Sequence, residues 1–405
     1  MEWIGEIPEG WEVKRLKRVA LINNSKRNYT QNQNLDAEVV FLPMEKVSEN
    51  GEINQELRKR IKDVSTGFTY FDKGDIILAK ITPCFENGKG AHLKNLETAF
   101  GFGSTEFHTI KALESLNSRF AFYQTKTNLF MKVGEGLMSG SAGQKRLPTN
   151  FVEDFPISLP PLSEQQAIAD FLDRKTAQIN SLIEKKRRLI ELLQEERIAV
   201  INQAVTRGID PSVKLKPSGV EWLGDIPEHW EVKKLKWVAD LRSGESITSE
   251  DIRPEGEYPV YGGNGLRGYT FRYTHEGHFI LIGRQGALCG NINYASNMFF
   301  ASEHAVVVTL LKKIDLLWLG ELLRTMNLNQ YSLASAQPGL SVDRIKNLSI
   351  PMPPEKEMTE IKNFIQVKMV HLDSTISKIE KEIELLSEYR TALISEVVTG
   401  KVKVV

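Results

Sequence analysis

Apolar residues recur at heptad spacing along two segments of the chain, and this spacing predicts two long helices. In residues 350–399 the two heptad seams hold nine apolar positions out of ten, and the break is Arg390. In residues 157–206 the corresponding seams hold seven out of ten, and Arg197 occupies the position that matches Arg390. A helix of about 43 residues is roughly 65 Å long, far longer than the usual globular helix. We therefore expect an antiparallel coiled coil, in which each arginine forms an ion pair with the partner helix.

The first of these helices has sequence signals at both ends. Pro160 and Pro161 end the preceding strand, because proline donates no hydrogen bond to a strand ladder. Ser163 precedes Gln166 by three residues, which is the spacing of a capping box, and Gly208 is suited to the position after a helix. These signals predict a helix that begins at Ser163 and ends before Gly208.

The chain also contains an internal repeat. Residues 2–20 and 221–239 are identical at 14 of 19 positions, and residues 157–206 and 350–399 agree at 20 of 50 positions. The segments between the matched ends barely align, namely residues 21–150 and 240–344. This pattern indicates a duplicated, pseudo-two-fold scaffold that presents two different surfaces. The alternative is a duplicated structural protein whose two copies have drifted apart.

Both middle segments have the pattern of mixed α/β domains. The first predicts strands at 74–83 and 101–110 and a helix at 118–133, and the second predicts strands at 278–286 and 299–308 and a helix at 316–328. The sequence therefore predicts an α+β protein with two mixed α/β domains, separated by two long antiparallel coiled-coil helices. The expected divisions are a first domain with its opening motif (1–155), a central spacer helix (156–208), a linker, second opening motif and second domain (209–349) and a C-terminal spacer helix (350–405).

Polar and basic side chains gather at the ends of the expected strands. The stretch YPVYGGNGLRGY (258–269) has glycines that permit turns and close approach to a ligand. Its other side chains suit base edges and phosphates, although an ordinary glycine-rich loop has the same composition. Each middle segment also ends with a glutamine in a small-residue loop, which either contacts phosphate or caps the next strand. The candidate nucleic-acid-contacting residues are Lys80, Gln144, Lys145 and Arg146 in the first segment, and Tyr261, Asn264, Arg267, Arg284 and Gln337 in the second.

Composition narrows the class of protein. The chain has 405 residues, 41% of them hydrophobic, and 52 basic residues balance 52 acidic ones; this composition excludes a disordered or collagen-like chain. Two cysteines cannot build a disulfide framework, and neither a signal peptide nor a membrane span is visible. We expect a soluble, cytoplasmic protein with no membrane partner. Because there is no basic excess, DNA binding has to be local or shared with a partner.

Catalytic motifs are missing from the sequence. There is no P-loop, no Asn-Pro pair of the amino-methyltransferase tetrapeptide, and no H-E-x-x-H or C-x-x-C metal motif. Serine, histidine and aspartate occur in no ordered nucleophile arrangement. We expect neither catalytic nor metal-binding residues, and no cofactor held by the chain itself.

Four motifs together resemble one known family. They are IPEGWEVKRL with its repeat IPEHWEVKKL, LPPLSEQQAIADFLD, INQAVTRG at the end of the first helix, and YPVYGGNG. In combination they resemble the type I restriction–modification specificity (S, or HsdS) subunits, and the resemblance covers essentially the whole chain. The second helix departs from the family motif, with PPEKEMTEI in place of PPLSEQQAI.

The resemblance implies a function and partners. In that family each middle segment is a target recognition domain for one half of a split, asymmetric double-stranded DNA site. The helices are spacers that dock two methyltransferase (M) subunits, and restriction (R) subunits join through them. S-adenosylmethionine and ATP belong to those partners, so the chain is expected to be a non-catalytic specificity subunit. Two alternatives are a coiled-coil assembly scaffold without DNA recognition, and a hidden nuclease or methyltransferase.

Overall fold

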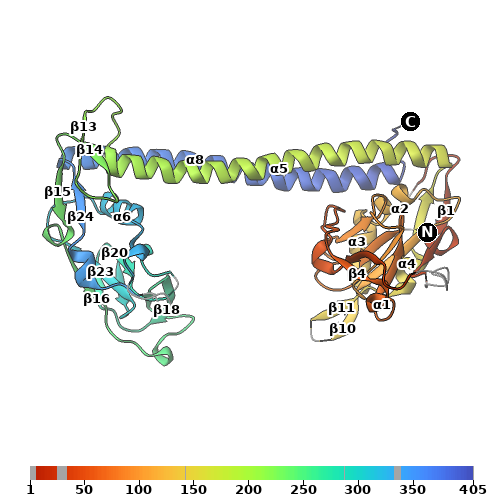
Figure 1. Ribbon diagram of the computed structural model, residues 1–405, viewed down its shortest axis with the longest axis horizontal. Coiled ribbons are helices and arrows are strands. Elements are labelled where there is room, and N and C mark those ends of the chain that lie inside the picture. Colours follow the sequence, from red (N-terminus) through yellow and green to blue (C-terminus); the bar gives the residue numbers. More distant parts are fainter. Residues whose placement is uncertain (1–5, 25–33, 142, 287, 333–338, 405) are drawn as a thin grey trace. The chain divides into compact units, whose positions relative to one another are not determined.

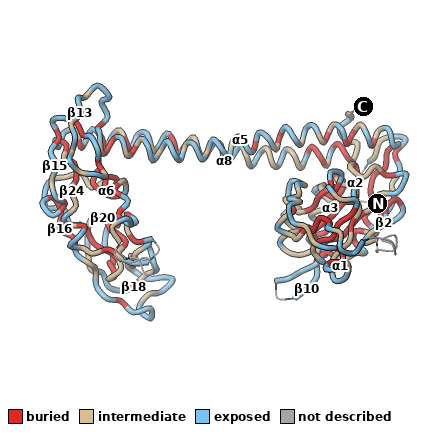
Figure 2. Tube along the Cα trace, in the orientation of Figure 1, coloured by how far each residue is buried: buried red, intermediate tan, exposed pale blue. Residues whose placement is uncertain are grey.

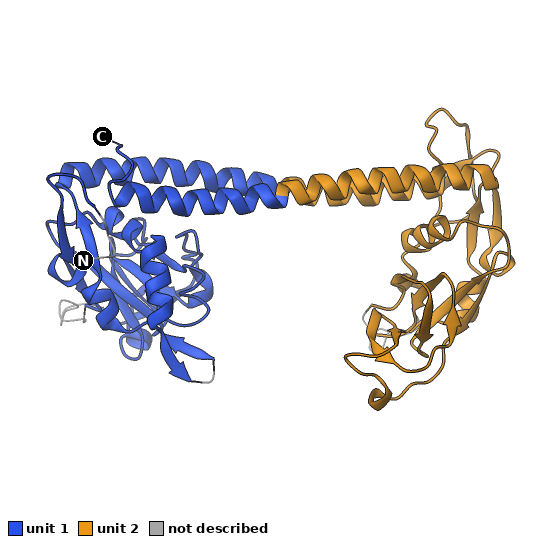
Figure 3. Ribbon diagram, turned by 180° about the vertical axis from the view of Figure 1, so that it is seen from behind, with its two compact units in different colours: residues 1–187, 380–405 blue, residues 188–379 orange. Residues whose placement is uncertain are grey.

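The chain divides into two compact units, each built around one middle segment (Figure 3). One unit comprises residues 1–187 and 380–405, and the other comprises residues 188–379. The division falls inside both long helices, α5 (Leu162–Arg207) and α8 (Glu355–Val398), so each unit holds part of both. The computed structural model describes residues 6–24, 34–141, 143–286, 288–332 and 339–404.

Two four-stranded sheets form the body of the first unit (Figure 1). One sheet has the order β2 (Ala20–Ile22), β9 (Phe107–Ala112), β6 (Ile76–Ala79), β7 (Gly90–His92). The other has the order β4 (Arg58–Arg60), β3 (Glu38–Leu42), β8 (Phe100–Gly103), β5 (Thr69–Asp72). In this second sheet β3 and β8 run parallel, and the remaining neighbours in both sheets are antiparallel.

The second unit repeats this topology strand for strand. Its sheets have the orders β16 (Ala239–Ser243), β23 (Ala305–Leu310), β20 (Phe279–Gly283), β21 (Ile292–Ala295), and β18 (Gly265–Thr270), β17 (Tyr258–Gly262), β22 (Met298–Ala301), β19 (His275–Glu276). The parallel pair recurs as β17 and β22. Two middle segments that barely align in sequence therefore share one fold, as the duplicated ends predicted.

A short strand pair closes each domain onto the helices. In the first unit β1 (Glu12–Arg15) pairs with β12 (Pro156–Leu159), and in the second β15 (Glu231–Lys234) pairs with β24 (Ser349–Met352). These strands join the two kinds of repeated motif, because β1 and β15 lie in the opening motifs, while β12 and β24 lead into the long helices.

Two of the predicted strands are each split between sheets. The segment 101–110 forms the end of β8 and the start of β9, and 299–308 likewise forms parts of β22 and β23. The chain turns at Ser104–Glu106 and at Ser302–His304, and crosses from one sheet to the other. The prediction of one continuous strand was wrong there, because three polar residues interrupt each apolar run.

The predicted helices of the middle segments are also interrupted. In the first, α2 (Ser118–Gln124) ends and α3 (Asn128–Leu137) begins, because the Thr127 hydroxyl accepts the Phe130 amide at 3.2 Å and caps a new helix. In the second, α6 (Leu316–Thr325) is followed by Asn327 in the left-handed region, with φ of 46°. Short helices α4 (Thr149–Asp154) and α7 (Val342–Lys346) follow in the two units.

The long helices pack antiparallel within each unit. In the first unit Asn180 of α5 accepts a hydrogen bond from Arg390, and Lys186 forms an ion pair with Glu382. In the second unit Arg197 forms an ion pair with Asp373 at 2.7 Å. The predicted ion pair is thus confirmed for Arg197. Arg390 instead donates hydrogen bonds to the side-chain carbonyls of Asn180 and Asn50.

Seam residues of the helices are buried where a domain or the other helix covers them (Figure 2). Buried members include Leu172, Ile179 and Ile183 on α5, and Ile365, Leu372, Ile379, Leu393 and Val397 on α8. The helix α5 begins at Leu162, so Ser163 lies inside its first turn, and the prediction of Ser163 as the cap was wrong. Gly208 follows the last helical residue with φ of 79°, as predicted.

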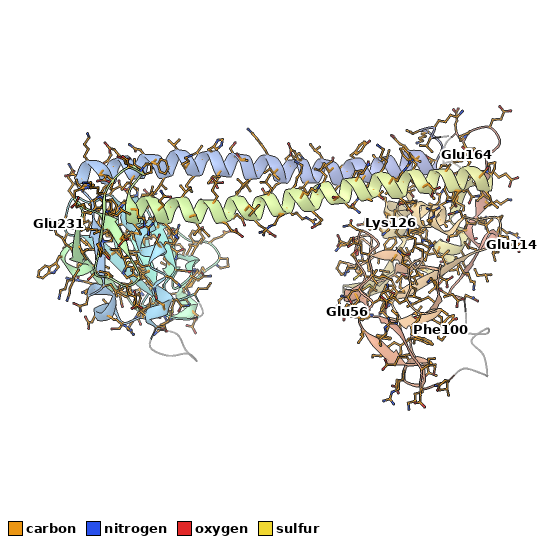
Figure 4. The ribbon with its side chains drawn as sticks, turned by 45° about the horizontal axis from the view of Figure 1, so that its top comes forward. Glu56, Phe100, Glu114, Lys126, Glu164 and Glu231 are labelled. Atoms are coloured by element: carbon orange, nitrogen blue, oxygen red, sulfur yellow. The ribbon has the colours of Figure 1, made fainter. Side chains whose placement is uncertain are left out.

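Matched indole–carboxylate hydrogen bonds fasten the opening motifs to the helices. The Trp11 Nε1 donates to Glu164 at 3.1 Å, and the Trp230 Nε1 donates to Glu357 at 3.0 Å. Both tryptophans are buried, and Figure 4 shows Glu164 on the first turn of α5. Among the described residues, the structure contains no helix with the length and apolar character needed to cross a membrane.

Candidate nucleic-acid interface

The four candidate residues of the first domain lie together. Lys80 follows β6, and the hairpin of β10 (Ser139–Ser141) and β11 (Gln144–Arg146) carries the other three. The Leu147 amide donates to the Lys80 carbonyl at 2.7 Å, which joins the base of the hairpin to the end of β6. Gln144, Lys145 and Arg146 are exposed, so the hairpin presents two cations and an amide to solvent.

Thr82 fixes this hairpin to the loop after β6. Its hydroxyl accepts the Lys145 amide at 2.7 Å and lies 3.0 Å from the Lys145 carbonyl. The buried His108 contributes a second attachment through its Nε2, which is 2.9 Å from the carbonyl of Leu147. Burial lowers the pKa of His108, so the neutral ring donates from Nε2 and its Nδ1 accepts from the Asn23 amide at 3.1 Å.

Glu106 belongs to the same cluster and was missed at the sequence level. It follows β8, and its carboxylate binds the Arg146 guanidinium in a bidentate ion pair, with contacts of 2.9 Å from both Nε and Nη2. Hydrogen bonding to Arg146, with the nearby charge of Lys80, lowers the pKa of Glu106. The turn residues Ser-Thr-Glu inside an otherwise apolar run were the available signal.

In the second domain the glycine-rich turn packs directly against the end of β20. A Cβ on Gly283 would lie 2.1 Å from the Gly263 carbonyl oxygen, so only glycine permits this approach of the two backbones. Asn264 lies at the tip of the turn and is exposed, and its Oδ1 accepts a hydrogen bond from the Asn291 amide at 3.2 Å. The turn thereby brings Asn264 close to the loop that begins at Arg284.

The other candidates of the second domain differ in orientation. The exposed side chain of Arg267 lies across Gly262, where an added Cβ would be 2.3 Å from the arginine Cδ. Tyr261 is half-buried, and its ring packs edge-on against Phe299 with centroids 5.7 Å apart. Arg284 is half-buried at the end of β20. Gln337 lies outside the described residues.

Backbone hydrogen bonds put the two sites in the same register. The Lys80 amide donates to the Glu106 carbonyl at 2.9 Å, and the Arg284 amide donates to the His304 carbonyl at 2.8 Å. The amides of Leu147 and Leu340 then donate to the carbonyls of Lys80 and Arg284, at 2.7 and 2.9 Å. Lys80 therefore corresponds to Arg284, and Glu106 corresponds to His304.

Several polar atoms near the second site are buried without a hydrogen-bond partner among the described residues. They are Asn293 Nδ2, Ser302 Oγ, Glu303 Oε2 and His304 Nδ1. Buried polar groups are usually satisfied by protein, water or a ligand. The site thus offers unused donors and acceptors beside the glycine turn. The described residues contain no group of three or more histidine, cysteine or acidic side chains placed to hold a metal ion.

Exposed aromatic and arginine side chains extend the second surface. Phe271 is 63% exposed and lies under the Arg253 guanidinium at 5.2 Å, and the neighbouring Tyr273 is also exposed. Such groups contact nucleic-acid backbones and bases. The alternation Phe271-Arg272-Tyr273 was visible in the sequence but was not selected there.

The two domains share one fold, and each is built on parts of the same two helices. The chain is therefore an internally duplicated protein with one cluster of candidate residues in each domain. The family model for the type I restriction modification DNA specificity domain matches residues 8–192 and 227–386. The chain belongs to this family, and the resemblance seen in its sequence is confirmed.

Individual relatives support the assignment over different lengths. The specificity subunit of the type I restriction enzyme EcoAI from Escherichia coli is 42% identical over 165 residues, which are 40% of this chain and 27% of that relative. The EcoKI specificity subunit of E. coli strain K12 is 21% identical over 449 residues, 98% of this chain and 90% of its own length. The matched part is therefore about a quarter of the length of the EcoAI subunit.

Solved structures share the fold over nearly the whole chain. A chain from a type I R-M system, solved to explain complex assembly and conformational transition, has a TM-score of 0.72 at 18% identity and covers 98% of this chain and 100% of its own. The HsdS subunit from Thermoanaerobacter tengcongensis has a TM-score of 0.56 at 18% identity and covers 98% of each chain.

Proposed function

We propose that this chain is the non-catalytic subunit that gives a type I restriction–modification complex its DNA sequence specificity. In this proposal each domain binds one half of a bipartite, asymmetric site in double-stranded DNA. The observation that carries the proposal is the identical backbone register of the two sites with different side chains in them. Lys80 and Glu106 in one domain correspond to Arg284 and His304 in the other. The same backbone arrangement with different side chains in the two domains suits the recognition of two different half-sites.

The side chains at the two sites supply what base recognition requires. Arginine and lysine donate to guanine, carboxylates accept from amino groups, and amides pair with adenine. The first site offers Lys80, Gln144, Lys145 and Arg146, and the second offers Asn264, Arg267 and Arg284, while the ring of Tyr261 packs on Phe299. Because neither segment has a marked basic excess, partner subunits would supply much of the general attraction to phosphate.

We further propose that the long helices dock two methyltransferase subunits, through which restriction subunits join. An exposed apolar side chain recurs on both helices at positions matched by the internal repeat. These are Leu192, which is 45% exposed, and Leu385, which is 50% exposed. S-adenosylmethionine and ATP would be bound by the partners. Exposed leucines at matched positions suit two copies of one partner.

The test is a map of methylated bases across the host genome, with and without the gene for this chain. Loss of one split, asymmetric methyl-adenine motif on deletion supports the specificity role and reveals both half-sites. An unchanged map, with the methyltransferase expressed, contradicts it and favours an assembly scaffold. Methylation by the purified chain alone would instead revive the enzyme alternative.

The Arg284→Ala variant then tests the second site. We expect the second half-site to relax or methylation to fall, because a guanidinium contact to a base or phosphate is lost. A map identical to that of the wild type would remove Arg284 from the proposed interface.

A further inference from the structure

Glu106 occupies a position at which an acceptor of hydrogen bonds faces the proposed DNA surface. It lies in the turn where the chain crosses from β8 to β9, next to Lys80, whose amide donates to its backbone carbonyl at 2.9 Å. Its side chain is 23% exposed, so the carboxylate is accessible although it is paired. The partner, Arg146, is on the hairpin that carries Gln144 and Lys145 and is 47% exposed.

The ion pair holds the two side chains in a defined arrangement. The Arg146 Nε and Nη2 both lie 2.9 Å from the Glu106 carboxylate, one to each oxygen. Such a fork fixes the plane of the carboxylate. The Arg146 Nε also lies 3.2 Å from Oε1, so Oε1 accepts twice from Arg146, whereas Oε2 accepts once. Since one carboxylate can accept about four hydrogen bonds, Oε2 keeps a free lone-pair direction. A DNA base can therefore be added to this pair without breaking it.

The matched position in the second domain carries different chemistry on the same backbone. His304 replaces Glu106, and its Nε2 lies 3.1 Å from Glu303 Oε1. A paired side chain thus occupies the turn between the same two strands in both domains. The two turns therefore present different hydrogen-bonding groups, a carboxylate and an imidazole, on the same backbone frame. Different groups at matched positions suit two different half-sites.

We propose that Glu106 is a specificity-determining residue of the first half-site. Its carboxylate accepts a hydrogen bond from the exocyclic amino group of an adenine or cytosine in the major groove, and Arg146 orients it. This inference rests on the proposed DNA-recognition function and adds a base-reading residue to it. A carboxylate has no donor to offer and repels phosphate, so its contact is with a base and not with the DNA backbone.

The Glu106→Gln variant tests this assignment in the intact complex with its methyltransferase subunits. The amide retains one acceptor and adds two donors, and exposed ion pairs contribute little to stability, so the domain stays folded. We expect relaxed or altered base preference at one position of the first half-site, with roughly ten- to hundred-fold weaker discrimination there. The second half-site is read in the same chain and stays unchanged.

Glu97→Gln is the matched control. Glu97 also pairs with an arginine, Arg58, on the surface of the same domain, but it precedes β8 whereas Glu106 follows it. We expect the Glu97→Gln variant to methylate the wild-type motif. The same change of motif in both variants would overturn the proposal, because loss of any surface ion pair would then suffice.

Arg146→Met separates base contact from positioning. Suppose that Glu106 only anchors Arg146 for a phosphate contact. The Glu106→Gln and Arg146→Met variants then both lower the methylated fraction at every site and leave the motif intact, and this result shows that the proposal is wrong. If the wild-type chain directs no motif at all, the proposed function fails. A wild-type motif that the Glu106→Gln variant leaves unchanged rejects only the role of Glu106.

Discussion

Replacing Gly283 by alanine is a direct test of how the second recognition surface is held. The added Cβ would lie 2.1 Å from the Gly263 carbonyl oxygen, whereas ordinary contacts begin at 3.4 Å. The glycine turn and the end of β20 must therefore separate by about 1.3 Å, and overpacking of this kind costs about 1–3 kcal/mol. The hydrogen bond of 3.2 Å between Asn264 and Asn291 spans the two loops that would move apart.

We expect the Gly283→Ala variant to fold and to lose discrimination in one half-site only. Each displaced base contact is worth about 1–3 kcal/mol, so methylation of the full motif falls while recognition of the first half-site persists. The equivalent residue of the first domain is Ala79, which precedes Lys80 as Gly283 precedes Arg284. The requirement for glycine is thus specific to the second domain.

The measurement is single-molecule sequencing of genomic DNA methylated by the variant complex, with thermal unfolding of the purified complex as a check on folding. The first half-site, read in the same molecules, is the internal control. An unchanged motif with an unchanged methylated fraction would refute the argument that the glycine contact positions the recognition turn. Equal loss of both half-sites would show instead that the substitution damages the whole protein.

Three further predictions concern stability, each measured by thermal or denaturant unfolding. Trp230→Phe removes the indole donor to Glu357 and part of a buried side chain, so we expect a loss of about 2–4 kcal/mol; a loss below 1 kcal/mol would contradict this. Burial raises the pKa of Asp75 to about 6 from 3.8. The ionised form of Asp75 therefore costs roughly 3 kcal/mol above pH 6, so the contribution of Asp75 to stability is fully present below pH 4 and is lost as pH rises through 6. Asp75→Asn should be more stable than wild type at pH 7.5 and equal to it at pH 4, and a constant difference would contradict the assigned pKa. Arg197→Leu fills a heptad position and loses only an exposed ion pair with Asp373, so we expect stability to be unchanged or to rise by about 1 kcal/mol; a marked loss would show that the pair is needed.

The two long helices and the duplicated organisation of the chain could be predicted, because both produce regular spacing or repetition in the sequence. Heptads predicted both long helices, and the repeated motifs predicted a duplicated scaffold, whereas the strands β1 and β15 inside the opening motifs were not predicted. The order and pairing of the strands within the two domains could not be predicted from the sequence, since the two middle segments barely align. The positions where strands change sheet, such as Ser104–Glu106, depend on tertiary contacts that a run of β-forming residues does not reveal.

The candidate site was predicted in part. Lys80 and the 144–146 segment lie more than sixty positions apart and meet through backbone hydrogen bonds between Lys80 and Leu147. Glu106 was missed because its role arises from a bidentate contact with Arg146, 40 residues away. Tyr261 was selected as an aromatic stacking face, yet its ring packs on Phe299. The residue types in the sequence indicated which groups could contact DNA. The direction in which each side chain points could be determined only from the folded structure.

The first unit includes residues from both sides of the second, and this affects the order in which the chain matures during synthesis. Its core contains Leu393, Ile394, Val397 and Val398 of α8, and the Val398 carbonyl accepts a hydrogen bond of 2.8 Å from the buried Ser158. The second unit is one continuous stretch, residues 188–379. During translation all residues of the second unit are therefore synthesised before the last core residues of the first unit, although synthesis of the first unit began earlier. The hydrophobic core of the first unit stays incomplete until the last helical turns of α8 are synthesised. A chain that lacks these turns would therefore have a defective first domain, although residues 1–187 of that domain are unchanged.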